Sequence, residues 1–166
     1  TRPYYLNSIT AGRSIFIRQL PTTVWQCFKD AKLFLDENYQ WWDDLQKIIF
    51  NKKADTRLDT GRIAEKRTLC FEEKRTGKKP KWKAFENNLL GYDVLSVKDE
   101  CSEELLAIEV KGSLHSINSA VFYITSGEWE YALLKQGHCF HIWSLPENKL
   151  AILKKDQIKS HVPTNN

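Results

Sequence analysis

Two neighbouring stretches near the middle of the chain have the patterns of β-strands. In residues 105–111 the apolar side chains recur at every second position, at Leu106, Ile108 and Val110, which is the period of a strand with one buried face. Residues 92–97 are rich in β-branched and aromatic side chains, and residues 98–104 are polar, as in a connecting loop. The pattern therefore predicts a β-hairpin whose loop is centred on Cys101.

The other face of the second strand carries charge, because Glu109 and Lys111 alternate there. If the strands pair symmetrically about Cys101, Asp93 lies opposite Glu109. Opposed residues in an antiparallel pair have Cβ atoms about 4.5–5.5 Å apart, so two carboxylates there repel each other unless a cation lies between them. The spacing predicts a divalent-metal site. The alternative is an ordinary Glu109–Lys111 ion pair beside an Asp93 that opens a turn.

Further elements follow the hairpin. Residues 121–124 are apolar and predict a third strand. Thr125 and Glu128 have the spacing of a capping box, which predicts a helix to about Gln136 with Gly137 as its stop. Residues 139–145 predict a fourth strand, residues 146–148 a turn, and residues 149–153 an edge strand.

The residues before the hairpin favour helices. Residues 14–20 are an apolar run typical of a short strand, whereas residues 22–35 and 41–49 repeat apolar side chains at helical spacing. The three tryptophans of this region fit a core better than a base-stacking surface: Trp25, Trp41 and Trp42. Residues 55–60 predict a linker, and a third helix begins near Arg62, with Glu65 in its first turns, where a carboxylate is favoured in any case.

The order from residue 62 to 145 is thus helix, strand, strand, strand, helix, strand, an α/β arrangement. We expect a small N-terminal helical extension over residues 1–60, a domain over residues 61–158 and a tail over residues 159–166. The 166 residues suit one compact domain with a short appendage. The chain begins at Thr1 and contains no Met, so we expect it to be part of a larger protein.

Composition narrows the class of protein. With 42% hydrophobic and 12% aromatic residues, a folded protein is indicated. The four cysteines lack the spacing of a zinc site or a disulfide framework, and no apolar run approaches the ~20 residues of a membrane span. These features favour a cytoplasmic protein, or a nuclear one in a eukaryote, that does not associate with membranes.

The third helix leads into a basic loop, residues 74–83. Residues 66–83 hold eight basic residues against two acidic ones. Such a loop can neutralise phosphates and bind nucleic acid without sequence preference, although a merely solvated loop is the alternative. The candidate phosphate-binding residues are Lys74, Arg75, Lys78, Lys79, Lys81 and Lys83.

The motifs GRIAEK, CFEE, GYDVLS, AIEVKG and ITSGEWEYA, with the closing aromatic strand, resemble the PD-(D/E)XK nuclease superfamily. The similarity is greatest to the domain at the C-terminus of NO VEIN-type proteins, which also occurs in restriction and defence proteins. It covers roughly residues 61–145. Tyr92 stands where the superfamily motif has its proline.

The resemblance implies a restriction-endonuclease-like αβββαβ core with a mixed central sheet flanked by helices. It implies that Asp93 and Glu109 bind Mg²⁺, for which Mn²⁺ substitutes, that Lys111 is the positioned base or an electrostatic aid, and that Glu65 is the helix-borne acid. Glu128 is explained by helix capping, with assistance to a nuclease site as the alternative. His138 and His141 point to opposite faces of a strand and make a poor metal pair.

We therefore expect a metal-dependent endonuclease that cleaves DNA, with RNA as the other candidate substrate, within a restriction or antiviral defence protein. Cutting both strands of a duplex usually takes two sites, which favours a homodimer. Many proteins of this fold have lost activity. The alternative is therefore a catalytically silent module that binds nucleic acid or another protein.

Overall fold

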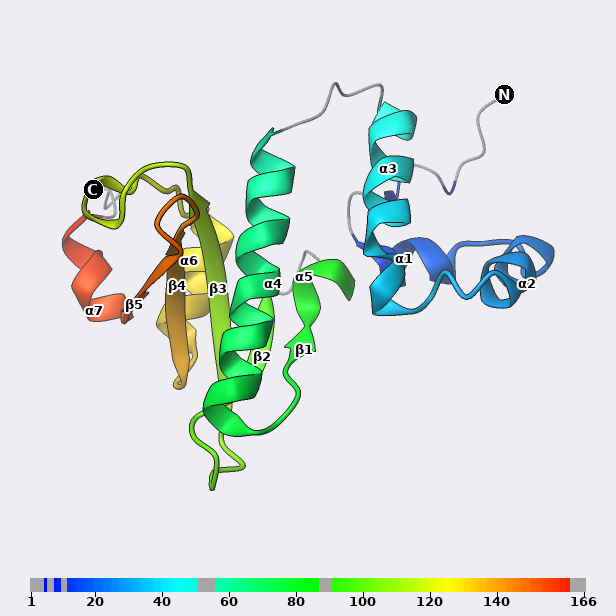
Figure 1. Cartoon of the computed structure of the whole chain (residues 1–166). Coiled ribbons are helices and arrows are strands. Elements are labelled where there is room, and N and C mark those ends of the chain that lie inside the picture. The colour runs from blue at the N-terminus through cyan, green and yellow to red at the C-terminus, as the bar shows by residue number, and fades with distance from the viewer. Residues whose placement is uncertain (1–4, 6–7, 10–11, 51–55, 87–90, 162–166) are drawn as a thin grey trace. The chain divides into compact units, whose positions relative to one another are not determined.

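The computed structural model describes residues 5, 8–9, 12–50, 56–86 and 91–161 (Figure 1). The chain divides into two units, one of residues 1–55 and 84–89 and one of residues 56–83 and 90–166. Each helix in the described ranges is too short or too polar to cross a lipid bilayer. Residues 162–166 of the expected tail, and residue 55 of the expected linker, lie outside the described residues.

The first unit is helical. It contains α1 (Arg13–Arg18), α2 (Thr22–Asp30), the 3₁₀ turn η2 (Asp36–Asn38) and α3 (Tyr39–Phe50), and it takes in most of α5 (Lys83–Glu86). The two predicted helices are confirmed, although α2 ends at Asp30 rather than Leu35. The predicted strand over residues 14–20 is wrong, because α1 occupies most of that segment.

Aromatic rings explain why this segment is a helical turn. Phe16 is buried, and its ring lies 6.3 Å from that of Phe28 and 5.6 Å from that of Trp42, measured between centroids. A turn of helix lets Phe16 enter this cluster, whereas a lone strand would have no partner for its backbone groups. Trp42 is buried and Trp41 packs on Phe28, which confirms the core interpretation of Trp42.

The second unit is built on a five-stranded mixed sheet. Its strands are β1 (Lys81–Trp82), β2 (Val94–Val97), β3 (Leu105–Ser113), β4 (His138–Ser144) and β5 (Lys149–Leu153), and they lie side by side in that order. β3 and β4 are parallel, and the other neighbouring pairs are antiparallel. The predicted mixed α/β arrangement with helices flanking the sheet is therefore confirmed.

The hairpin has the predicted register. Val97 pairs with Leu105 and Val94 with Ile108, which is symmetric about Cys101. The apolar face of β3 was also predicted correctly: Ile108 and Val110 are buried in the same cluster as Ala64 of α4 (Thr56–Thr76).

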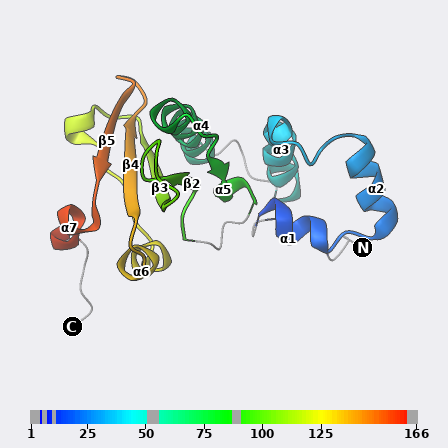
Figure 2. The same ribbon diagram turned by 90° about the horizontal axis from the view of Figure 1, so that it is seen from below.

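Helices cover both faces of the sheet (Figure 2). On one face α4 packs over Val94, Ile108, Val110, Cys139 and Trp143. On the other face, Ala132 of α6 (Ser126–Leu134) and Ile158 of α7 (Lys155–Ile158) pack against Phe140 and Ile142 of β4. Short 3₁₀ turns, η3 (Ile117–Ser119) and η4 (Lys159–His161), complete the second unit.

Three predicted details of the second unit are wrong. Residues 56–60 belong to α4 rather than to a linker, so Glu65 lies in the middle of that helix and not in its first turn. Residues 81–82 of the basic loop form β1, and Lys74 and Arg75 belong to the last turn of α4. The third predicted strand, residues 121–124, is a connection without sheet pairing.

The apolar run at residues 121–124 has another cause. Phe122 and Ile124 pack against the core between the sheet and α6, while Val121 and Tyr123 are exposed. Because β2 and β4 already occupy both edges of β3, this segment crosses to α6 without pairing beside β3. Its apolar character reflects packing on a core and not a hydrogen-bonded strand.

The capping box is confirmed. Thr125 accepts from the Glu128 backbone N–H, and the Glu128 carboxylate accepts from the Thr125 backbone N–H at 2.8 Å. The helix ends at Leu134, slightly before the predicted Gln136. Gly137 follows with φ +69°, a left-handed conformation that favours glycine. The predicted turn at residues 146–148 and the edge strand β5 are confirmed.

Candidate active site

The site lies where β3 continues past the start of β2. The two strands pair as far as Val94 and Ile108, so residues 109–113 of β3 extend beyond that pairing. Asp93 directly precedes β2 at this point. Its backbone N–H donates to the Ile108 carbonyl at 3.0 Å, and its carboxylate accepts from the Val110 backbone N–H at 2.8 Å. Asp93 is therefore held at the position where the two strands separate.

Glu109 and Lys111 point to the face of β3 that α6 covers. The Lys111 ammonium lies 2.8 Å from a Glu109 carboxylate oxygen and 2.9 Å from a carboxylate oxygen of Glu128. Glu109 is only 3% exposed. Glu128 comes from the first turn of α6, where the capping box with Thr125 already orients it. Lys111 thus bridges two acids from two different elements.

Glu65 reaches the same region from α4. Its carboxylate accepts from the indole N–H of Trp82 and from the guanidinium of Arg62 at 2.9 Å. Trp82 is buried, so it holds Glu65 rather than offering a ring to solvent. A Cβ at Gly112 would lie 2.7 Å from the Thr60 carbonyl oxygen of α4, so the absence of a side chain there allows the close approach of α4 to β3.

Burial and mutual repulsion alter the acidity of the two central carboxyl groups. Burial, followed by the negative charge of Glu65, raises the pKa of Asp93 to about 7. Burial and the charge of Asp93 raise the pKa of Glu109 well above its usual value. Shifted pKa values of neighbouring acids in a recess are common at functional sites, although structural ion-pair networks also produce them.

Lys111 and Glu128 keep their charges. Burial alone would lower the pKa of Lys111, but the carboxylates of Glu109 and Glu128 outweigh burial and raise it. For Glu128, burial is outweighed by Lys111 and by the Thr125 N–H, and its pKa is lowered. The site therefore holds a charged ammonium group and an ionised Glu128 beside two acids that resist ionisation.

These groups line one cavity of about 590 Å³. This volume is within the range of ligand sites, roughly 300–1,000 Å³. The cavity therefore gathers all four residues that the sequence analysis selected as catalytic, together with Glu128. Its lining includes Glu65, Asp93, Glu109, Lys111, Glu128, His115 and Tyr123.

The donor atoms suit a hard divalent cation. Mg²⁺ is commonly held by one or two carboxylates and keeps water or substrate phosphate as its other ligands, and Asp93 and Glu109 supply such a pair. A cation between them would offset the repulsion that contributes to the raised pKa of Glu109. Within the described ranges, no group of three or more His, Cys, Asp or Glu side chains is arranged to hold a metal ion.

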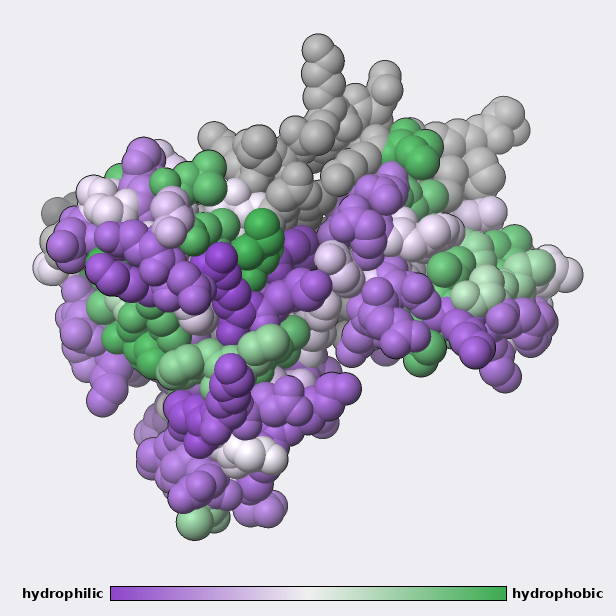
Figure 3. All heavy atoms as spheres, in the orientation of Figure 1, coloured by the Kyte–Doolittle hydropathy of each residue, from purple (hydrophilic) through white to green (hydrophobic). Residues whose placement is uncertain are grey.

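The six candidate phosphate-binding residues differ in their surroundings. Arg75 donates to the Glu72 carboxylate and to the carbonyls of Val97 and Lys98, so it ties α4 to the hairpin loop. The Lys78 ammonium donates to the Ser102 carbonyl at 2.9 Å. Lys83 is half-buried, while the remaining three are exposed: Lys74, Lys79 and Lys81. Figure 3 shows hydrophilic side chains covering the tip formed by the end of α4 and the β2–β3 loop.

The two histidines of β4 lie on opposite faces of the sheet, as predicted. His138 packs against Tyr131 of α6, and His141 packs against Phe71 of α4. Burial lowers the pKa of each to about 4, so both are neutral at pH 7. They neither pair with each other nor line the cavity.

Glu128 was explained in the sequence analysis by helix capping, with assistance to the site only as the alternative. The capping box is a local pattern, and it does not report that the same carboxylate contacts Lys111, which is 17 residues earlier in the chain. The one sequence signal for this contact was the alternation in residues 105–111, which placed Lys111 on the face of the strand opposite Ile108. Because α6 had to cover that face, its first turn could be expected near Lys111. The contact between Trp82 and Glu65 was also missed, because a local pattern does not report contacts between segments that are distant in the chain.

Comparison with known proteins places the chain in a family. No curated protein and no solved structure matches it. The family model described as "Protein NO VEIN, C-terminal" matches residues 64–150, just over half of the 166 residues. The matched region contains Glu65, Asp93, Glu109, Lys111 and Glu128. The chain therefore belongs to the NO VEIN C-terminal family.

Proposed function

We propose that this chain is a Mg²⁺-dependent endonuclease domain that hydrolyses phosphodiester bonds in DNA. The observation that supports this proposal most strongly is the meeting of Asp93, Glu109 and Lys111 at one cavity. Two carboxyl groups that can hold a divalent ion and a charged ammonium group beside them are the groups that metal-assisted hydrolysis of a phosphodiester needs.

In this proposal Asp93 and Glu109 hold Mg²⁺, with Mn²⁺ able to replace it. An ion held there would make a water molecule more acidic and would absorb negative charge on the phosphate. Lys111 orients that water or stabilises the developing charge, and Glu128 keeps the ammonium group in place at 2.9 Å. Glu65, held by Trp82 and Arg62, assists from the α4 side of the cavity.

The arrangement of elements supports a finer assignment. Along the chain, α4 is followed by β1, β2 and β3, then by α6 and β4, which is the order αβββαβ if the short α5 is left aside. We propose that this is a restriction-endonuclease-like core of the PD-(D/E)XK superfamily. Its three strands before α6 are then β1, β2 and β3, and residues 121–124, which we expected to be the third, are not among them.

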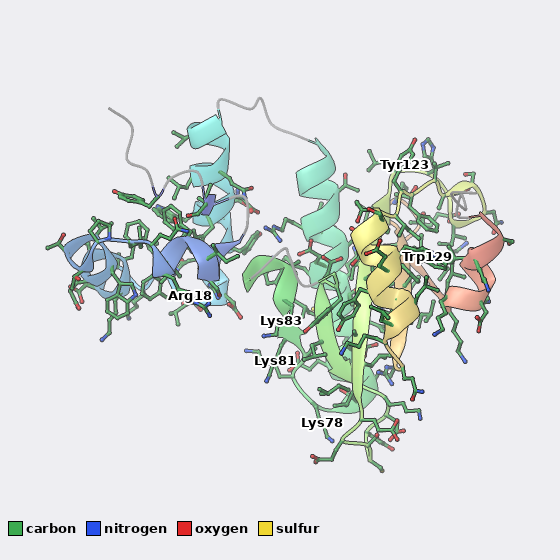
Figure 4. All side chains as sticks on the ribbon, turned by 180° about the vertical axis from the view of Figure 1, so that it is seen from behind. Arg18, Lys78, Lys81, Lys83, Tyr123 and Trp129 are labelled. Carbon is green, nitrogen blue, oxygen red and sulfur yellow. The ribbon has the colours of Figure 1, made fainter. Side chains whose placement is uncertain are left out.

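The basic residues at the β1 edge would bind the DNA backbone. Lys78, Lys81 and Lys83 follow this edge of the sheet (Figure 4), and neutralisation of phosphates by such side chains gives affinity without sequence preference. We further propose that the domain works within a larger restriction or defence-type protein in the cytoplasm, or in the nucleus of a eukaryote. A homodimer would allow cleavage of both strands.

Cleavage of labelled DNA by the purified chain tests the proposal. We expect cleavage in Mg²⁺ or Mn²⁺ and none in EDTA. Asp93→Ala, Glu109→Ala and Lys111→Ala should each lower the rate by at least about a hundredfold, as expected for a group that transfers protons or stabilises charge. Glu103→Ala, which removes an exposed acid of the hairpin loop, is the matched control and should cleave normally. Cleavage by Lys111→Ala at the same rate as by the unaltered protein would refute the proposed mechanism.

A catalytically silent module that binds nucleic acid is the second candidate. It is favoured by one observation: Lys111 is already engaged by two carboxylates, which a purely structural ion-pair network would also show. This candidate predicts salt-sensitive DNA binding, no cleavage in either metal, and normal binding by the Glu109→Ala variant.

A further inference from the structure

The mouth of the cavity carries exposed apolar side chains. Leu114, Val121 and Tyr123 line the same cavity as the acids, and they are 62%, 63% and 82% exposed. All three belong to the connection between β3 and α6. Figure 4 shows Tyr123 on this connection, away from the β1 edge that carries Lys78, Lys81 and Lys83. The cavity thus has an acidic interior and an apolar, partly aromatic rim.

Local packing explains why residue 123 faces outward, but it does not explain why that residue is a tyrosine. Its neighbours Phe122 and Ile124 turn inward and pack against the core, so the backbone directs Tyr123 outward. The exposed ring is also not needed to start α6, because Thr125 and Glu128 cap that helix. A large exposed aromatic side chain at the edge of a cavity is typical of a binding surface.

The acids lie below the surface. Glu109 is 3% exposed, and 17% of the Lys111 side chain is exposed. A phosphodiester must therefore enter the cavity to reach them. The backbone of a duplex is held on a stiff helix whose bases face inward, whereas an unpaired nucleotide can turn its base outward and bend its backbone into a recess.

We propose that the cavity accepts an unpaired nucleotide of single-stranded DNA, with its base stacked on Tyr123 and its phosphate directed towards Asp93, Glu109 and Lys111. This inference rests on the proposed nuclease function and adds the substrate class. Leu114 and Val121 form the apolar wall beside the base. Stacking on an aromatic side chain is tolerant of sequence, because every base has a π-face.

The binding test uses an inactive background so that Mg²⁺ can be present without hydrolysis. In Asp93→Asn protein, fluorescence anisotropy is measured with a labelled single strand of about 15 nucleotides and with a hairpin duplex of the same sequence. We expect tighter binding of the single strand. Adding Tyr123→Ala should weaken single-strand binding by about tenfold, and Tyr123→Phe should restore it, since the ring and not the hydroxyl makes the contact.

Leu134→Ala is the matched control. Leu134 is as exposed as Tyr123, at 83%, but it lies at the end of α6 and does not line the cavity. Its removal should leave both affinities unchanged. A circular dichroism spectrum identical to that of the parent protein would show that Tyr123→Ala preserves the fold.

Cleavage by otherwise unaltered protein separates this inference from the proposed function. If neither DNA form is cleaved or bound, the nuclease proposal fails and this inference fails with it. If the duplex is cleaved as fast as the single strand, and Tyr123→Ala changes neither binding nor cleavage, the inference alone is overturned. Faster cleavage of the single strand that Tyr123→Ala removes and Tyr123→Phe restores would support both.

Discussion

The cavity is lined by more acidic groups than basic ones. Among the described residues, four carboxyl groups and one ammonium group line it. Lys111 lies between Glu109 and Glu128, and Arg62 holds Glu65. The Asp93 carboxylate accepts from the Val110 backbone N–H, but burial dominates and raises its pKa to about 7. A buried carboxyl group with a raised pKa lowers the stability of the protein at any pH at which it must ionise.

Asp93→Asn should therefore stabilise the protein above neutral pH. Between pH 3.8 and about 7 the folded protein retains a proton on Asp93 that the unfolded chain releases, so the free energy of unfolding falls as pH rises through this window. The Asp93→Asn variant has no carboxyl group at this position, so its free energy of unfolding does not fall in this way. Its advantage should be at most about 4 kcal/mol above pH 7 and should vanish below the lower limit of the window.

Urea unfolding of both proteins across that pH range measures the difference. An amide retains the oxygen that accepts from the Val110 N–H, so the hydrogen bond at the strand junction is preserved. A variant that is less stable than the parent at pH 8 would contradict the argument. Addition of Mg²⁺ should stabilise the parent more than the variant, because the carboxylate is a ligand in the proposed site.

At the scale of elements, the site depends on how closely α4 approaches β3. Gly112 lies in β3 at the open end of the sheet, and Thr60 and Ala64 of α4 occupy the space where a side chain would be. Glu65 follows Ala64 on the same helix, so a displacement of α4 would also move Glu65. The approach of helix to strand therefore contributes to both the stability and the geometry of the cavity.

Gly112→Ala should destabilise the protein by about 1–3 kcal/mol, as overpacking does in a close-packed interface. The added Cβ would lie 2.7 Å from a backbone oxygen of Thr60, which cannot move without the helix. Thermal unfolding measures the effect. Gly127→Ala in α6 is the control: no atom lies within 4 Å of its added Cβ, and alanine in a helix should stabilise by up to about 1 kcal/mol. Equal melting temperatures for the two variants would refute the packing argument.

At the scale of the whole molecule, charge is distributed unevenly. The net charge is only +4, yet residues 66–83 carry eight basic and two acidic residues. Lys81 of β1 and Lys83, the first residue of α5, lie at one edge of the sheet (Figure 4). The cavity itself is acidic. A polyanion would therefore be attracted to the β1 edge and would need a cation to enter the cavity.

Neutralising the β1 edge should weaken DNA binding and its salt dependence together. The variant with Lys78, Lys79, Lys81 and Lys83 changed to Gln should bind at least about tenfold more weakly. The slope of log affinity against log salt should fall by up to about 0.7 for each phosphate of the single strand that the protein no longer neutralises. Anisotropy titrations at several salt concentrations measure both quantities.

A matched variant separates a local effect from net charge. Changing Lys135, Lys149, Lys154 and Lys159 to Gln removes the same total charge from positions outside the basic loop. It should reduce affinity much less. Equal losses for the two variants would mean that net charge, and not the β1 edge, attracts the DNA.

Local patterns in the sequence determined much of the second unit. The alternation in residues 105–111 and the symmetric loop were enough to predict the hairpin and its register, because strand pairing across a short loop depends on neighbouring residues. The capping box likewise predicted the start of α6. The expected strand over residues 121–124 was wrong because a short apolar run reports burial and does not report whether a partner strand is available.

Tertiary structure alone decided which side chains meet. Glu65, Lys111 and Glu128 come from α4, β3 and α6, and only the packing of those elements joins them around one cavity. The burial that raises the pKa of Asp93 to about 7, and that makes Trp82 a partner for Glu65, also depends on all layers at once. The physical reason is that periodicity fixes a side chain's direction relative to its own element, whereas desolvation and convergence depend on the positions of the others.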